Sequence, residues 1–189
     1  TPAHKGMTPP DYKPAVNRKR RANRKRKGNL VIVESPAKAQ SIGRFLGKGY
    51  KLKASVGHVR DLLKSRMAVD VENNFEPVFR VPNDKREIVK ELKKDVAAAE
   101  AVYLATDLDR EGEAIAWHLM ESAEIEPDRL RRVTFHEITR SAIEHAFAHP
   151  RGINMQLVEA QQTRRSVDRL VGFSLSQLLW KKVAGRLGA

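Results

Sequence analysis

A short apolar strand followed at once by a dense run of acids is the feature that most constrains this chain. Residues 101–105 form an apolar, strand-like stretch, and Asp107, Asp109, Glu111 and Glu113 follow within a few positions. Carboxylates this close repel one another, and withdrawing them from water is costly unless a positive charge neutralises them. Two interpretations are open: a solvated helix start, where acids are favoured in the first turn, or a site for a divalent cation.

Glu34 likewise comes at the end of a strand-like run, because it directly follows residues 30–33, which are mostly β-branched. Asp107 and Asp109 are two residues apart, so in an extended segment their side chains point to the same side. Glu111 begins the following helix and can turn toward the same point. Mg²⁺ prefers oxygen ligands, usually one or two carboxylates with several waters. The pattern therefore favours a magnesium site without excluding the solvated helix start.

Strands and helices alternate along the middle of the chain. Ser35 followed by Pro36 is a helix-start signal, with Ser as the cap and Pro at the first helical position. Further elements are expected as strands at 50–59, 101–106 and 132–138, and as helices at 83–100, 111–122 and 139–150. This alternation predicts an α/β fold with a mostly parallel sheet covered on both faces. Ligands of such sheets bind at the carboxyl ends of the strands, where Glu34 and Asp107 lie.

The net charge of +13 is concentrated at one end of the chain. Residues 1–28 contain ten Lys or Arg and a single acid, Asp11. This segment is predicted to be a disordered basic arm that binds polyanions, directs nuclear import or simply aids solubility. The chain has no cysteine, which excludes disulfides and thiolate metal sites. No apolar run reaches the roughly 20 residues that cross a bilayer, so no membrane association is expected.

From Ile153 onward the sequence is helix-like, with one break expected at Gly172. Arg164 and Asp168 are four residues apart and can form a salt bridge, whereas Arg165 and Asp168 share a face with a glutamine that suits phosphates or base edges. Phe173 and Trp180 can stack on unpaired bases or pack in a core. Both alternatives remain open for each of these residues.

Five stretches, in this order, resemble the N-terminal part of type IA DNA topoisomerases and are most similar to bacterial topoisomerase I. They are LVIVESPAKA, SVGHVRDL, YLATDLDREGEAIAWHL, FHEIT and AQQTRRSVDRLVGFSLSQLLWKK. Topoisomerase III and reverse gyrase share the layout. The resemblance implies a Toprim domain at 29–140. It also implies that 141–189 is a linker helix and the truncated beginning of a helical domain that binds single-stranded DNA.

Residue by residue, the resemblance implies roles at the matching positions. Asp107 and Asp109 match Mg²⁺-binding acids, with Glu111 in the same cluster. Glu34 matches a glutamate at the scissile region that takes part in metal binding or proton transfer, and Lys38 a lysine that stabilises charge at the reacting phosphate. DNA contacts are implied at the remaining positions: His58, Arg110, Arg164, Arg165, Asp168, Phe173 and Trp180. Arg110 is equally well explained by a structural ion pair.

The activity implied is relaxation of negatively supercoiled DNA through cleavage of one strand by a tyrosine, with Mg²⁺ and without ATP. The chain has only Tyr12, Tyr50 and Tyr103, none in the family's tyrosine motif, so no nucleophile is expected in it and the fragment alone should not cleave. The expected partners are a single-stranded gate segment and supercoiled duplex, bound by a monomer in the bacterial cytoplasm at the nucleoid. A Toprim nuclease or primase, and a non-catalytic nucleic-acid-binding module, are the alternatives.

Overall fold

The structure is a computed structural model that describes residues 28–63 and 66–183. Apart from Gly28, the expected basic arm lies outside these residues. Four parallel strands form the central sheet, in the order β2-β1-β7-β8. They are β1 (Asn29–Val33), β2 (Tyr50–Ala54), β7 (Ala101–Leu104) and β8 (Leu130–Arg132). The α/β fold predicted from the alternating pattern is therefore confirmed.

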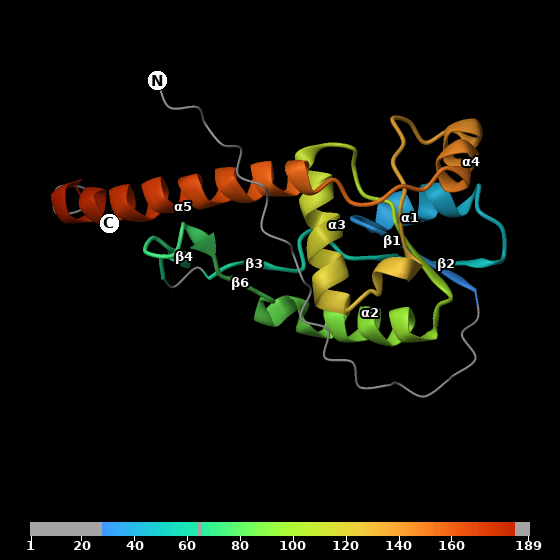
Figure 1. The fold of residues 1–189 in the computed structure, drawn as a ribbon, viewed down its shortest axis with the longest axis horizontal. Coiled ribbons are helices and arrows are strands. Elements are labelled where there is room, and N and C mark those ends of the chain that lie inside the picture. Colours follow the sequence, from blue (N-terminus) through green and yellow to red (C-terminus); the bar gives the residue numbers. More distant parts are fainter. Residues whose placement is uncertain (1–27, 64–65, 184–189) are drawn as a thin grey trace, which may run out of the picture.

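Helices cover both faces of this sheet. On one face α2 (Arg86–Ala98) and α3 (Arg110–Ala123) pack on Leu30, Ile32 and Leu104. On the other face α1 (Pro36–Gly43) and α4 (Arg140–Ala148) pack on Val31 and Val33. Figure 1 shows α1 and α4 together at one end of the molecule. Because β1 is buried on both faces, its sequence is a continuous apolar run rather than an alternating one.

The connection from β2 to α2 contains four two-residue strands. These are β3 (Asp61–Leu62), β4 (Val69–Asp70), β5 (Glu76–Pro77) and β6 (Phe79–Arg80), paired β3 with β6 and β4 with β5, both antiparallel. A small apolar cluster of Leu62, Ala68 and Val69 packs with Leu170 of the last helix. Two short 3₁₀ turns, η1 (Asn83–Lys85) and η2 (Pro127–Arg129), precede α2 and β8.

The last helix, α5 (Met155–Val183), extends far beyond the sheet (Figure 1). Its first part packs against α3, and its far half is largely exposed. The prediction of a helix break at Gly172 is wrong, because α5 continues through this residue. A single glycine in a helix interior costs only about 1 kcal/mol relative to alanine, which a 29-residue helix tolerates.

The strand expected at 132–138 is also misplaced, because β8 ends at Arg132. Its partner β7 ends at Leu104, and Val133 makes the last contact with it, donating its backbone N–H to the Leu104 carbonyl at 3.0 Å. Residues 133–138 have a strand-like sequence but no neighbouring strand within the described part of the chain, and they form a loop that leads to α4.

Candidate functional site

The strands β1 and β7 are neighbours, so Glu34 and the loop 105–109 meet at the carboxyl edge of the sheet. The ammonium of Lys38 joins them, because its Nζ donates to Glu34 Oε1 and, at 2.5 Å, to Asp107 Oδ1. Lys38 is placed by the start of α1, where the Ser35 side chain caps the helix and accepts from the Lys38 backbone N–H. Glu34 and Asp107, which the sequence places at two strand ends, therefore lie together and are bridged by a cation.

The two carboxyls of this pair differ in environment. Burial raises the pKa of Glu34 above its usual value, and its Oε2 is buried without a hydrogen-bond partner in the described structure. The hydrogen bond from Lys38 lowers the pKa of Asp107, whose side chain is largely exposed. For Lys38, burial acts to lower the pKa, but the hydrogen bonds to Asp107 and Glu34 outweigh it and raise the pKa. At neutral pH the trio therefore holds a lysine cation against Asp107 and the less acidic Glu34.

The other acids of the motif have different partners. Asp109 is the N-cap of α3, and its Oδ1 accepts from the Gly112 backbone N–H at 2.8 Å. Glu111 contacts His58 Nε2 at 2.5 Å and accepts from Gln161 Nε2 of α5 at 3.2 Å. Asp109 therefore fits the interpretation of the acids as a solvated start of a helix. Glu111 instead connects α3 to α5 and does not join Glu34.

Glu113 is completely buried and is surrounded by cationic groups. It forms ion pairs with Arg132 at 3.0 Å and with Arg151, and it accepts from the Asn154 backbone N–H at 2.9 Å. Sequence reasoning missed Arg132 and Arg151 in this role. A signal was available, because Glu113 lies three residues before Ala116 on the apolar face of α3, where a carboxylate requires a partner.

Arg132 fixes the backbone of the acidic loop. Its guanidinium is buried and donates to the carbonyls of Leu104, Thr106 and Asp107 at 2.6 to 3.1 Å. Gly112 closes the loop from the other side, because a Cβ there would lie 2.0 Å from the Asp107 carbonyl oxygen. The backbone that carries Asp107 is therefore held by Arg132 on one side and approached closely by Gly112 on the other.

The predicted DNA-contacting residues fall into two groups. His58 and Arg110 lie near the carboxyl edge, on the β2–β3 loop and at the first position of α3. The second group belongs to α5 and comprises Arg164, Arg165, Asp168, Phe173 and Trp180. The structure joins His58 to this helix indirectly, through Glu111 and Gln161.

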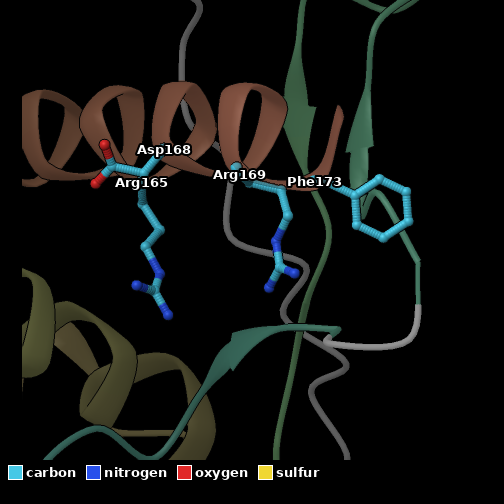
Figure 2. Close-up of a pocket in the computed structure, with 5 residues that line it drawn as sticks. Arg165, Asp168, Arg169 and Phe173 are labelled. Atoms are coloured by element: carbon cyan, nitrogen blue, oxygen red, sulfur yellow. The ribbon is translucent and has the colours of Figure 1, made fainter. Parts of the chain in front are cut away.

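Along α5, Arg164 and Asp168 form a loose, exposed ion pair at 3.8 Å. Arg165 instead makes a bidentate contact with Asp61 of β3, at 2.8 and 2.9 Å. Figure 2 shows Arg165 and Arg169 extending toward the same side of α5, in a shallow pocket that Phe173 also lines. Trp180 is 74% exposed, so it is not a core residue here.

The sequence also predicts a Mg²⁺ site. Among the described residues, no group of three or more His, Asp or Glu side chains converges as a metal site. The pair Glu34 and Asp107 nevertheless fits Mg²⁺, since it offers only oxygens, includes a buried oxygen without a partner and already binds a cation.

None of the described helices is long and apolar enough to span a bilayer.

Comparisons with known proteins agree with this geometry. Residues 29–138 match the family described as Toprim domain. The chain is also similar to full-length topoisomerase I from Thermotoga maritima, with 45% sequence identity and a TM-score of 0.75. The match covers 80% of this chain and 26% of the Thermotoga maritima chain. The resemblance predicted from the five sequence motifs is thereby confirmed.

Proposed function

This chain belongs to the Toprim domain family, and we propose that it is the N-terminal part of a type IA DNA topoisomerase. The whole protein would relax negatively supercoiled DNA by transient cleavage and religation of one strand, with Mg²⁺ and without ATP. The observation that carries the proposal is the convergence of Glu34, Lys38 and Asp107 at the carboxyl edge of the sheet. The likeness to the Thermotoga maritima topoisomerase supports it.

We assign the metal site to Glu34 and Asp107, with Asp109 and Glu111 in the adjacent positions of the motif. Glu34 and Asp107 would hold Mg²⁺ there, and the ion would supply positive charge next to a phosphodiester. Lys38 contributes a second cation toward the same phosphate. Glu34, whose pKa is raised by burial, is suited to give a proton to the 3′ oxygen that leaves on cleavage and to take it back on religation.

The helix α5 supplies the proposed interface for single-stranded DNA. Arg164 is exposed, and Arg165 and Arg169 reach to one side of the helix, where they can contact phosphates (Figure 2). Phe173 and the exposed Trp180 can stack on unpaired bases. Arg110, exposed at the start of α3, and His58 would contact the strand where it passes the carboxyl edge.

The nucleophilic tyrosine has to come from outside the described residues. Tyr50 and Tyr103 pack against each other with ring centroids 5.6 Å apart, and both contact Phe147 of α4 on the α1/α4 face. Their rings are therefore structural. Tyr12 lies outside the described residues. We infer that residues 1–189 alone bind Mg²⁺ and DNA, as a monomer, without cutting a strand.

The test compares the longest natural form of the protein with residues 1–189 on negatively supercoiled plasmid, with Mg²⁺ and no ATP. Relaxation by the long form only, abolished by Asp107→Ala with Asp109→Ala, is the expected result. Nicked or degraded plasmid without relaxed topoisomers would indicate a Toprim nuclease instead. Tighter DNA binding by the double variant, with no Mg²⁺ effect in the unmodified protein, would indicate a non-catalytic binding module.

In a bacterial cell the topoisomerase would act in the cytoplasm, at the nucleoid.

A further inference from the structure

The Lys38 ammonium lies between the two carboxylates that we assign to the metal, and we propose that it is a built-in counter-ion that Mg²⁺ displaces on binding. Lys38 would thus hold the site closed until the metal arrives and then become available to an anion. This inference rests on the proposed function, because it takes Glu34 and Asp107 as magnesium ligands.

The geometry gives Lys38 the place of a ligand-bound cation. Its Nζ contacts one oxygen of Glu34 and one of Asp107, residues 73 positions apart that are brought together by β1 and β7. The Lys38 and Glu34 side chains are only 17% and 16% exposed, so the ammonium is withdrawn from water and held by both acids. The metal would be held by these same two carboxylates, between which the ammonium now lies.

The two cations exclude each other for reasons of size and charge. Mg²⁺ binds oxygens at about 2.0–2.1 Å and needs near-octahedral geometry, which leaves no room for an ammonium between the same two carboxylates. A divalent ion also repels a neighbouring ammonium twice as strongly as a monovalent ion would. Without metal the trio of Glu34, Asp107 and Lys38 has a net charge of about −1, whereas replacement of Lys38 by Mg²⁺ makes the site neutral.

The chain allows the exchange without movement of the fold. Lysine carries its charge on a flexible four-carbon stem, so the ammonium can turn away while α1 stays in place. It would turn toward the edge of the sheet, where we place the DNA backbone. Binding of Mg²⁺ and binding of a phosphate would then favour each other, because the metal releases the cation that contacts the phosphate.

Two measurements test the exchange. Calorimetric titration with MgCl₂ should show about tenfold tighter binding to Lys38→Met than to the unmodified chain, since no ammonium competes. The matched control is Lys93→Met, which removes a lysine that pairs with Glu124 at 2.6 Å, beyond the opposite end of α3. Labelling of the unmodified chain with an amine-reactive acyl ester should show Lys38 protected without Mg²⁺ and modified with it, and Lys93 unchanged.

The outcomes separate this inference from the function on which it rests. Equal or weaker Mg²⁺ binding by Lys38→Met, or a Lys38 that stays protected at saturating Mg²⁺, overturns the exchange and leaves the metal site intact. Absence of Mg²⁺ binding in both the unmodified chain and Lys38→Met overturns the metal assignment and the exchange with it. The labelling experiment needs no variant, so a folding defect in Lys38→Met does not weaken the test.

Discussion

Arg132 and Glu113 form an ion pair in which neither side chain is exposed to solvent, with the Arg132 Nε donating to Glu113 Oε1 at 3.0 Å. The pair connects β8 to the first turn of α3, and the remaining Arg132 donors hold the carbonyls of the acidic loop. Glu113 also accepts from the Asn154 backbone N–H, immediately before α5. One buried pair therefore contacts both the loop of the proposed metal site and the start of the proposed DNA-binding helix.

Replacing Arg132 by methionine should lower the free energy of unfolding by about 3–5 kcal/mol, because it leaves the buried Glu113 charge without its only fully buried cationic partner among the described residues. Urea denaturation measures the change. The control Arg164→Ala removes an exposed arginine whose ion pair with Asp168 is loose, and should cost no more than about 1 kcal/mol. Equal effects of the two variants would show that the buried pair does not organise the loop.

Replacing Gly112 by alanine should destabilise the protein by about 1–3 kcal/mol, although alanine is the better helix former. The added Cβ would lie 2.0 Å from the Asp107 carbonyl oxygen and 2.6 Å from its carbonyl carbon, so the loop has to move. Mg²⁺ binding measured by calorimetry should weaken in parallel. Gly172→Ala is the matched control, since nothing lies within 4 Å of the added atom and stability should rise by up to about 1 kcal/mol. A Gly112→Ala protein as stable as Gly172→Ala would contradict the close approach.

The sequence predicted the fold class and the position of Glu34 and Asp107 at strand ends, because both depend on local pattern. A strand that ends in an acid places that acid at the carboxyl edge, and neighbouring parallel strands bring two such acids together. The cap at Asp109 follows from local chemistry as well. The strand ends and the cap require no knowledge of distant contacts, whereas the pairing of β1 with β7 that brings Glu34 to Asp107 does.

The partners of Glu111 and Glu113 could not be read in this way. Glu111 contacts residues 53 and 50 positions away, and Arg151 lies 38 positions after Glu113. Such pairs depend on how segments distant in the sequence pack together, which local periodicity does not determine. The same holds for Asp61, which contacts Arg165 from 104 positions away.

Stability should depend on pH through His118, which packs among Phe79 and Trp117 with 2% exposure. Burial lowers its pKa to about 3, so it is neutral in the folded protein while the unfolded chain binds a proton below about 6.5. Its contribution is therefore complete above pH 6.5 and is lost as pH falls toward 3, by up to about 1.4 kcal/mol per pH unit.

Comparing His118→Leu with the unmodified chain in urea titrations between pH 7 and 4.5 isolates this effect. The variant should lose less stability on acidification. Its free energy of unfolding should fall with pH less steeply, by up to about 1.4 kcal/mol per pH unit, which is the slope for one proton. His145→Leu, at an exposed position of α4, is the matched control substitution. Parallel pH profiles for His118→Leu and the unmodified chain would show that His118 binds a proton as readily in the folded protein as in the unfolded chain.

Substitutions of Arg165 and Asp61 should change DNA affinity in opposite directions. Asp61 partly neutralises Arg165 through a bidentate contact, and the guanidinium of Arg165 lowers the pKa of Asp61 against the effect of burial, so the acid is charged at neutral pH. Arg165→Ala removes a phosphate contact, whereas Asp61→Asn leaves the arginine in place with its charge uncompensated. The first variant should weaken binding to a single-stranded oligonucleotide and the second should tighten it.

Fluorescence anisotropy at several salt concentrations measures both effects. For Arg165→Ala, the slope of log affinity against log salt should become shallower by about 0.7, the value for one lost contact to a single strand. The loss should be similar for oligonucleotides of different sequence, because phosphates carry no sequence information. Arg140→Ala, in an exposed ion pair on α4, controls for the change in net charge and should leave the slope unchanged. If Arg165→Ala and Arg140→Ala weaken binding equally, α5 is not the interface and the arginine acts only through the total charge of the protein.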